Sequence, residues 1–593
     1  MALKFTGTFD DLESRLASLG GAWDKNQPNK KVLRLGHGVM NWFESTGSIN
    51  FQGKEPDKLK LETDVPKLLY PSEPQQLKET NSISMDTFAS GEQREKKPQQ
   101  DNLLSLELQY LTTGINESEL IIGIVSSVGT EYKRVTEPLT DKLQGFGYTV
   151  KDIRVSSILP KYDGRNEYER IKHYMNAGDT LRDKSGNNAI LSAGVAKEIS
   201  NSRTTGAPKT AYIVNSLKHP SEVELLRKIY GDGFYLIGIH ADEKRRRQHL
   251  CEDKGLTQSE ANELIKIDED ESVDHGQKTR DTYHLSDFFL NFGSNSDQVK
   301  NGLQRFLELI FSHPYKNPTF DEFAMFMAFN SSVRSGDLSR QVGAVISREK
   351  QIIATGANDV PKSGGGLYWA EVDPKTGKVE DLPDGKDYTR EIDSNKQAQA
   401  EIIEEIAGNL LSKGLLKEES QFEIMKILKD SKISDLTEFG RVVHAEMDAL
   451  LSCGRAGIPT SGSTIYCTTF PCHNCAKHII ASGVQRVVYV EPYPKSRALD
   501  FHSESITLKS EFEESTPDNK ATVAFEPFIG IGPRRFLDLF SMSLGGGAKL
   551  KRKDKGGSVL EWDKTKAPIR SPLVPKSYKE IESAASELWD NIK

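Results

Sequence analysis

The chain has 593 residues, and its 78 Lys and Arg against 86 Asp and Glu give a formal net charge of −8. At roughly 100 to 200 residues per domain, this length predicts about three to five compact units. The acidic balance argues against an extended nucleic acid as a default partner, because the field of the chain repels polyanions. No stretch approaches the roughly 20 apolar residues of a membrane span, and the start lacks a signal-peptide core, so a cytoplasmic protein is expected.

The first segments predict a small domain and a connection. Residues 1–71 carry a helical DDLESRLASLG and the short strand candidates KVLRLGHG, MNWFES and SINFQG, which predict a small α/β domain of unknown role. Residues 72–117 begin with a run rich in Ser, Gln, Glu, Lys and Pro. Such a composition buries too little apolar surface to offset its ordering entropy, so a flexible linker is expected.

Residues 118–310 alternate buried-strand and helical patterns. ELIIGIVSSV, GYTVKDIRVS, TAYIVNS and GFYLIGIHAD are strand candidates separated by helical sequence, which is typical of a parallel α/β sheet. The predicted fold class is therefore α/β, in several domains.

A loop after the first of these strands has the features of a phosphate-binding turn. It carries Gly123, Ser126, Ser127, Gly129 and Thr130 between a strand and a helix, where backbone N–H groups can bind a phosphate. The lysine that a Walker loop places before its Ser or Thr is missing, so nucleotide binding is favoured over phosphoryl transfer. The alternative is a glycine turn that only closes a strand–helix corner.

The stretch AYIVNSLKHPSEVELLRKIYGDGFYLIGIHADEKRRRQHL resembles the nucleotide and dephospho-coenzyme A kinases of the P-loop fold. The resemblance implies a P-loop kinase-like parallel α/β domain over 118–310 that binds a regulatory nucleotide. It also makes Arg245, Arg246 and Arg247 candidates for a lid over bound phosphates, with a solvated basic helix face as the alternative.

Residues 311–545 form a further α/β pattern through QVGAVIS, QIIATGAN, VHAEMDALLSCG, STIYCTT, CAKHIIASG and VQRVVYVEP. A polar insertion over 363–440 interrupts this pattern, and the sequence indicates no role for it. Residues 546–593 predict a flexible basic tail and a terminal helix.

The five cysteines are too few for a disulfide scaffold, and four of them lie within 23 positions. His444-Ala445-Glu446 is followed by Pro471-Cys472-His473-Asn474-Cys475. His444, Cys472 and Cys475 can supply three zinc ligands and leave a position for water. Zinc lowers the pKa of that water, and Glu446 can take and return its proton. The combination H-x-E with P-C-x-x-C is the known signature of zinc nucleobase deaminases.

Other interpretations of the motif remain open. The Cys-x-x-Cys pair could be a redox pair, or half of a structural zinc site whose fourth ligand is His473 or Cys467. Cys453 and Cys467 are expected to be buried residues of a helix and a strand. Cys251 lies far away in the preceding domain.

From about Phe320 to Pro494, the blocks SRQVGAVIS, ATGAND, VHAEMDALL and TTFPCHNCAKHIIASGVQRVVYVEPY resemble the deoxycytidylate deaminase branch of the zinc-dependent cytidine deaminase family. The resemblance implies an α/β/α sandwich, a Zn²⁺ cofactor, Glu446 as the catalytic proton carrier, and conversion of cytosine to uracil with release of ammonia. Asn358 matches the asparagine that contacts the sugar hydroxyl. Arg340 and Lys362 are candidate phosphate contacts, although exposed basic residues are more often only solvated.

The succession of a P-loop-like domain, a deaminase-like domain with an insertion, and FEPFIGIGPRRFLDLFSM resembles the bacterial anti-phage dCTP deaminases. The resemblance implies that dCTP is converted to dUTP, and dCMP to dUMP, which depletes dCTP during infection. It also implies a homo-oligomer and control by cellular factors or a small inhibitory RNA. The basic run from Lys549 to Lys555 is a candidate RNA contact, with a solvated tail as the alternative.

Two other functions remain open. A polynucleotide base deaminase acting on tRNA or single-stranded DNA shares the zinc signature, but the acidic charge argues against it. A non-catalytic nucleotide sensor with a structural zinc site is the other.

Overall fold

The structure is a computed structural model that describes residues 3–5, 7–27, 29–54, 56–69, 118–203, 209–269, 275–292, 296–436, 438–492, 496–509, 522–545, 549–573 and 590. The chain divides into two compact units, residues 1–100 and 101–593. The predicted linker 72–117 lies outside the described residues, as does the predicted terminal helix apart from Asp590. Within the described ranges, no helix combines the length and the apolar character that crossing a membrane requires.

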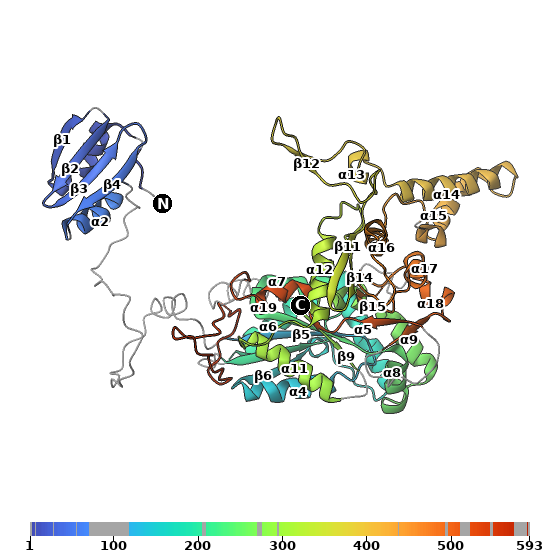
Figure 1. Ribbon diagram of the computed structural model, residues 1–593. Helices are drawn as coiled ribbons and strands as arrows, with labels where there is room; N and C mark the ends of the chain where they lie inside the picture. The colour runs from blue at the N-terminus through green and yellow to red at the C-terminus, as the bar shows by residue number, and fades with distance from the viewer. Residues whose placement is uncertain are drawn as a thin grey trace. The chain divides into compact units, whose positions relative to one another are not determined.

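The first unit is a four-stranded antiparallel meander with helices packed on it (Figure 1). Its elements are α1 (Phe9–Leu16), η1 (Ala17–Leu19), β1 (Ala22–Gln27), β2 (Lys30–Leu35), β3 (Gly38–Phe43), β4 (Ser48–Gly53) and α2 (Asp57–Leu69). Trp42 is buried at its centre, and its indole N–H donates to the backbone oxygen of Phe5. The sequence predicts only three of the four strands, because the edge strand β1 has no buried apolar side chain to mark it.

The second unit contains two six-stranded sheets. The first has the order β18-β9-β8-β5-β7-β6, and its five long strands are parallel. The strands are β5 (Leu120–Ser126), β6 (Thr149–Arg154), β7 (Thr210–Asn215), β8 (Phe234–His240), β9 (Phe288–Asn291) and β18 (Gly530–Ile531). The four strand candidates of 118–310 correspond to β5 to β8, so the expected parallel α/β sheet is confirmed.

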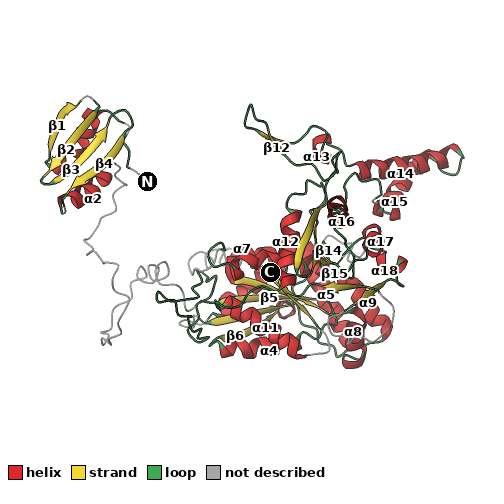
Figure 2. Cartoon of the chain, in the orientation of Figure 1, coloured by secondary structure: helices red, strands yellow, loops and turns green. Residues whose placement is uncertain are grey.

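Helices cover both faces of this sheet (Figure 2). One face packs on α4 and α11, and the other on α6 and α7, since alternate residues of each strand point to opposite faces. The helices are α4 (Lys133–Gly145), η2 (Val155–Ile158), α5 (Glu167–Ser185), α6 (Ile190–Ser202), α7 (Pro220–Tyr230), η3 (Gly231–Gly233), α8 (Glu243–Gln248), η4 (His249–Asp253), α9 (Gln258–Glu269), α10 (Thr279–Tyr283) and α11 (Ser296–Ile310).

The second sheet has the order β11-β10-β14-β15-β17-β16, in which β14, β15, β17 and β16 run parallel and β10 is antiparallel to both of its neighbours, β11 and β14. The strands are β10 (Gly343–Arg348), β11 (Gln351–Ala357), β14 (Thr464–Thr469), β15 (Arg486–Glu491), β16 (Ile506–Leu508) and β17 (Val523–Pro527). Helix α12 (Phe320–Ser332) packs on one face, and α16 (Ala445–Ala456), α17 (His473–Ala481) and α18 (Ala498–Phe501) lie on the other. This is the α/β/α arrangement expected from the sequence.

The insertion is a segment of chain that leaves the second sheet and returns to it. Its two ends are joined by a pair of backbone hydrogen bonds between Asp359 and Val443. The excursion contains β12 (Glu371–Val372), β13 (Val379–Glu380), α13 (Asp387–Arg390), α14 (Ser394–Ser412), η5 (Glu418–Ser420), α15 (Gln421–Lys429) and η6 (Lys432–Asp435). Helices α14 and α15 pack together and project from the rest of the unit (Figure 1).

The two sheets share one hydrophobic core, in which α12 packs between them. Glu322 of α12 is 1% exposed and accepts two hydrogen bonds of 2.7 Å from Arg305 of α11. The same carboxylate accepts the N–H of Ile531, whose strand β18 extends the edge of the first sheet beside β9. The predicted regions 118–310 and 311–545 are therefore parts of one compact unit.

The segment after the second sheet packs against the first. It contains η7 (Pro533–Arg535) and α19 (Phe536–Phe540), followed by residues 549–573. Arg570 is 1% exposed and donates to the backbone oxygens of Asp538 and Ser541, while Leu573 is buried. Residues 549–573 are thus anchored by buried side chains, which differs from the flexible tail expected from their basic composition.

Candidate active site

The residues of the two motifs lie at the N-termini of two neighbouring helices. His444 is the N-cap of α16 and Cys472 is the N-cap of α17, each with an extended backbone. The N–H of Cys475, in the first turn of α17, points at the Cys472 sulfur across 3.4 Å. The exposed N–H groups at helix N-termini favour negative charge, which suits thiolate ligands.

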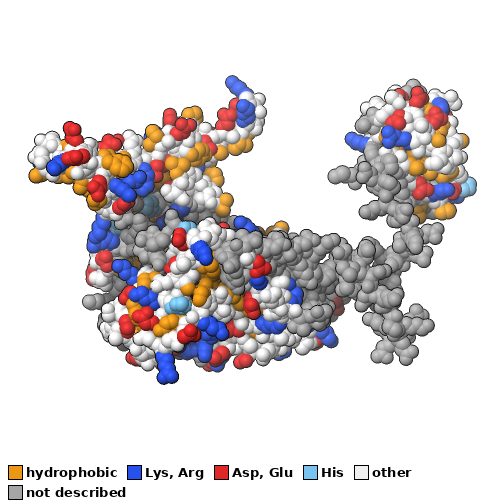
Figure 3. Space-filling model, turned by 180° about the vertical axis from the view of Figure 1, so that it is seen from behind, with side chains coloured by type: hydrophobic (Ala, Val, Ile, Leu, Met, Phe, Trp, Pro, Cys, Tyr) orange, Lys and Arg blue, Asp and Glu red, His pale blue; other side chains and the backbone are white. Residues whose placement is uncertain are grey.

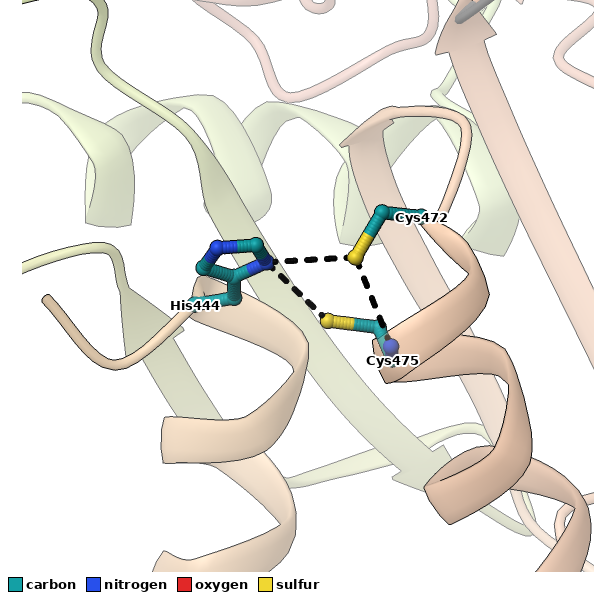
Figure 4. Close-up of side chains that lie close together, drawn as sticks. All are labelled: His444, Cys472 and Cys475. Carbon is teal, nitrogen blue, oxygen red and sulfur yellow. Dashed lines mark hydrogen bonds between the residues drawn. The ribbon is translucent and has the colours of Figure 1, made fainter. Parts of the chain in front are cut away.

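His444, Cys472 and Cys475 form one cluster (Figure 4). The imidazole Nδ1 of His444 lies 3.4 Å from the Sγ of Cys472 and 3.4 Å from the Sγ of Cys475. Ligands about 2.0 to 2.3 Å from a tetrahedral zinc lie roughly 3.5 Å apart, so these three atoms fit one zinc ion. In the parts of the chain that the structure describes, no fourth His, Cys, Asp or Glu joins this cluster. A set of three protein ligands leaves one position for a small molecule.

The charges within the cluster are coupled. The Cys475 thiol and the His444 ring lower the pKa of Cys472 to about 4, whereas the neighbouring Cys472 and burial raise the pKa of Cys475. The hydrogen bond to Cys472 raises the pKa of His444 to about 9. Metal ligands must be deprotonated, so a bound metal ion would compete with protons for these three side chains.

Glu446 lies in the first turn of α16, two residues after the histidine, and is 4% exposed. Burial raises the pKa of its carboxyl above the ordinary value for glutamate, against the opposing effect of His444. A carboxyl group with a raised pKa can both accept and return a proton near neutral pH.

These side chains face a cavity of about 290 Å³. The motif residues His444, Glu446 and Cys472 line it together with Thr469 and Phe470 at the end of β14. The insertion supplies further lining residues, Asp387, Asp393, Asn395, Lys396, Ser434, Leu436 and Gly440. The insertion, for which the sequence indicated no role, therefore contributes to the site.

Asn358, the predicted sugar contact, lines this cavity and holds the loop beside it. Its side-chain oxygen accepts the N–H of Val342 at 2.6 Å, and its amide donates to the backbone oxygen of Arg340 at 2.9 Å. Arg340 also lines the cavity and pairs with Glu491 at 3.0 Å. The observed bonds of Asn358 thus fix the shape of the cavity wall.

The other residues singled out near the motif lie elsewhere. Lys362, a predicted phosphate contact, pairs with Glu371 and is not among the residues lining the cavity. Cys453 and Cys467 are fully buried in α16 and β14, as expected for core residues. His473 points towards Glu438 and Phe501 and is outside the metal-ligand cluster.

The phosphate-loop residues are partly brought together. Ser126, Ser127, Gly129 and Thr130 line a second cavity of about 580 Å³ at the end of β5. Gly123 does not line it, because this residue lies within β5, where a Cβ would meet Leu217 and Phe234 at 2.7 and 2.8 Å. A glycine is needed at position 123 for strand packing, so the assignment of Gly123 to a phosphate loop is wrong.

The predicted lid arginines also lie outside this second cavity. Arg245 pairs with Glu131, and Arg247 pairs with Glu243. Arg246 is buried and packs behind the loop, where its backbone oxygen would lie 2.7 Å from a Cβ at position 129. Arg245 and Arg246 thus contact the loop, Arg247 pairs within its own helix, and none of the three lines the cavity as a phosphate lid would.

Several residues of the site were not predicted. Phe470 directly precedes the Pro-Cys motif, so its proximity could have been inferred from that adjacency. The insertion residues carry no comparable signal. Asp387, Asp393, Asn395 and Lys396 lie at least 40 positions before His444, and Ser434, Leu436 and Gly440 belong to no motif.

The sheet is covered by helices on both faces and carries a His-Cys-Cys cluster at two helix N-termini, with a buried glutamate beside the cluster. This arrangement defines a class of metal-dependent proteins. The family model described as the cytidine and deoxycytidylate deaminase zinc-binding region matches residues 318–491. The deoxycytidylate deaminase of Enterobacteria phage T4 is 31% identical over 173 residues, which cover 29% of this chain and 77% of that protein. The chain belongs to this zinc-binding deaminase family, and zinc is the metal of the site.

Other relatives match different lengths. ComE operon protein 2 of Bacillus subtilis (strain 168) is 40% identical over 84 residues, 14% of this chain and 44% of that protein, so the match spans less than half of that relative. The deoxycytidylate deaminase of Saccharomyces cerevisiae is 25% identical over 294 residues, 48% of this chain and 76% of that protein. A crystal structure of the cyanophage S-TIM5 dCMP deaminase with dCMP and dUMP aligns with 36% of this chain and 99% of its own, at 19% identity and a TM-score of 0.19.

Proposed function

We propose that the protein is a hydrolytic deaminase of deoxycytidine nucleotides that converts dCTP to dUTP and also dCMP to dUMP. The observation that carries the proposal is the buried Glu446 beside three side chains that fit one zinc ion, with Glu446, His444 and Cys472 lining one cavity. Relatives named deoxycytidylate deaminase, including the phage T4 protein, supply the substrate class.

His444, Cys472 and Cys475 would hold the zinc ion. When bound, zinc supplies a water molecule that is acidic enough to be used near neutral pH. Glu446 takes a proton from the attacking water, delivers one to the ring nitrogen of cytosine, and passes the next to the departing amine. The C4–N bond breaks, a C4–O bond replaces it, and ammonia leaves.

The remaining walls orient the nucleotide. Phe470 provides an aromatic surface next to Cys472 on which a pyrimidine can pack. The loop held by Asn358 brings Arg340 to the cavity, and the insertion brings Lys396 to it. Lys396 donates to the neutral Gln399 at 3.1 Å and has no acidic partner among the described side chains. It is the better placed of the two cations to bind a substrate phosphate.

We also propose that the activity serves anti-phage defence by depleting dCTP. This rests on the resemblance of the whole arrangement to the anti-phage deaminases. Cells that produce the protein should lose dCTP during infection, and cells with an inactive variant should not.

The direct test is product analysis of purified zinc-loaded protein with dCTP, dCMP, CTP and deoxycytidine. Uracil nucleotides should form from dCTP and dCMP, and Glu446→Ala should abolish their formation by removing the proton carrier. Glu404→Ala, at an exposed position on α14, is the matched control and should retain activity. Undiminished turnover by Glu446→Ala, or turnover of cytosine only within oligonucleotides, contradicts the proposal.

A further inference from the structure

Three carboxylates gather in the wall of the catalytic cavity. Asp337, Asp387 and Asp393 line it, and the last two belong to the insertion. Burial raises the pKa of the Asp387 carboxyl above its ordinary value, and Arg441 opposes this rise. Asp337 and Asp393 raise the same pKa, so the three carboxylates lie within one another's electric field. Carboxylates repel a phosphate and accept hydrogen bonds, so this group favours a neutral donor on the ligand.

Asp387 is the carboxylate of this group with an acceptor left for a ligand. It is 8% exposed, whereas the other two are only partly buried. Each of the other two accepts two backbone N–H groups of its own turn. One oxygen of Asp387 accepts a hydrogen bond of 2.8 Å from Arg441, and its second oxygen has no donor in the described part of the chain. That second oxygen can accept a hydrogen bond from a bound molecule.

Two ion pairs hold this carboxylate in place. The first joins Asp387 to Arg441, three residues before the zinc ligand His444. In the second, the ammonium group of the preceding residue, Lys386, donates to Asp359 at 2.6 Å, and the two side chains are 7% and 1% exposed. The backbone of Asp359 in turn pairs with the residue directly before His444. The carboxyl group is thus fixed relative to the zinc ligand, as a substrate contact must be.

The asparagine expected to contact the sugar hydroxyl is already bonded. The side-chain oxygen of Asn358 accepts the N–H of Val342 at 2.6 Å, and its amide donates to the backbone oxygen of Arg340 at 2.9 Å. A donating sugar hydroxyl therefore needs another acceptor in this cavity. A 5′-nucleotide of deoxycytidine carries only two neutral donors, the amine that the reaction removes and the 3′-hydroxyl. Since the amine must lie at the zinc ligands, the 3′-hydroxyl is the donor left for a carboxylate.

We propose that Asp387 is a specificity-determining residue that accepts a hydrogen bond from the 3′-hydroxyl of the deoxyribose. The proposal rests on the proposed deaminase function, and it assigns the sugar contact to the insertion in place of Asn358. The 5′-phosphates are left to Arg340 and Lys396. A cytosine inside a polynucleotide has an esterified 3′-oxygen, which cannot donate and places a phosphate beside carboxylates. The same contact therefore selects free nucleotides over polynucleotides.

The test compares dCTP with 2′,3′-dideoxy-CTP, which lacks only the 3′-hydroxyl, as substrates of the zinc-loaded full-length protein. The native chain should prefer dCTP by about 10- to 100-fold in kcat/KM, as expected for a hydrogen bond to a charged group. Asp387→Ala should lower kcat/KM for dCTP by about the same factor and leave the value for dideoxy-CTP unchanged. Asp430→Ala, at an exposed position at the end of α15 outside the cavity, should keep the native preference.

A second substrate pair tests the repulsion. Deoxycytidine 3′,5′-bisphosphate differs from dCMP by a phosphate on the 3′-oxygen. The native chain should use it less efficiently than dCMP by about tenfold or more, and Asp387→Ala should narrow this gap.

A second variant separates binding from folding. Asp387→Asn keeps the shape of the side chain and an acceptor for Arg441, so it should retain the native melting temperature and zinc content while the preference for dCTP falls. The proposal is overturned if the native chain uses dCTP and dideoxy-CTP equally well, or if both variants keep the native preference. It is also overturned if Asp387→Ala lowers kcat/KM equally for both substrates, because a purely structural role would do so. If the native chain forms no uracil nucleotide from dCTP or dCMP, the proposed function itself fails, and this proposal fails with it.

Discussion

Lys396 gives the sharpest test of how the insertion serves the catalytic cavity. The side chain starts at the first turn of α14, whose N-cap Asp393 accepts the N–H groups of Asn395 and Lys396. This capping fixes the backbone, so replacing Lys396 by Met removes the charge and keeps the local fold and the aliphatic stem. Among the described side chains, the native ammonium donates to the neutral Gln399, so its loss leaves no buried acid without a partner.

The expected magnitude follows from a single charge-assisted contact. A hydrogen bond to a charged group contributes about 1.5 to 3 kcal/mol, and the exposed position of Lys396 places it at the lower end. We therefore expect kcat/KM for dCTP and dCMP to fall by about tenfold, mainly through KM. Deoxycytidine has no phosphate, so its kcat/KM should stay unchanged.

The assay compares the three substrates for the native chain, Lys396→Met and the matched control Lys413→Met, an exposed lysine at the other end of α14. The control should behave as the native chain with every substrate. An equal loss for deoxycytidine and dCTP would refute the reasoning, because the variant would then have disturbed the cavity instead of a phosphate contact.

Three further predictions concern the metal and the packing. Chelation should lower both the zinc content and the melting temperature, and added Zn²⁺ should restore both. The variant His444→Ala should not regain zinc when Zn²⁺ is added. An unchanged melting temperature after chelation would contradict a preformed site. Glu322→Gln should destabilise the second unit by about 3 kcal/mol, measured by denaturant unfolding, because it leaves the Arg305 charge without its buried partner. Gly343→Ala should lower the melting temperature, since its Cβ would lie 1.9 Å from the backbone oxygen of Ala328, whereas Gly408→Ala, with open space around it, should be neutral or slightly stabilising.

The sequence predicted the elements that carry a strong local signal. Strands β5, β7 and β8 are buried on both faces and read as continuous apolar runs, so their positions were predictable. The cluster of His444, Cys472 and Cys475 was predictable because the H-x-E and P-C-x-x-C spacing is typical of a metal site. Edge strand β1 has no such run, and nothing local to it indicates a strand.

Contacts that depend on the return of distant segments were not predictable. Lys396 reaches the catalytic cavity only because Asp359 and Val443 pair at the base of the insertion. Gly123 was misassigned because a glycine required by packing looks the same in sequence as a glycine required by a phosphate. The buried role of Arg570 was hidden by its basic surroundings.

Figure 3 shows acidic and basic side chains interspersed over the face in view, without a continuous basic stripe. A polynucleotide would need such a stripe to follow its backbone. On this face, the surface pattern agrees with the acidic balance of the chain in favouring small substrates.

The pairing of β18 with β9 has a consequence for synthesis on the ribosome. The β9 edge emerges early, but the residues that cover it, Gly530 and Ile531, are translated some 240 positions later. During that interval the nascent chain presents an uncovered strand edge, which is a site for pairing with other chains. A chain interrupted before residue 530 would therefore keep that edge permanently open, so truncated products should aggregate or be degraded even when every catalytic residue has been made.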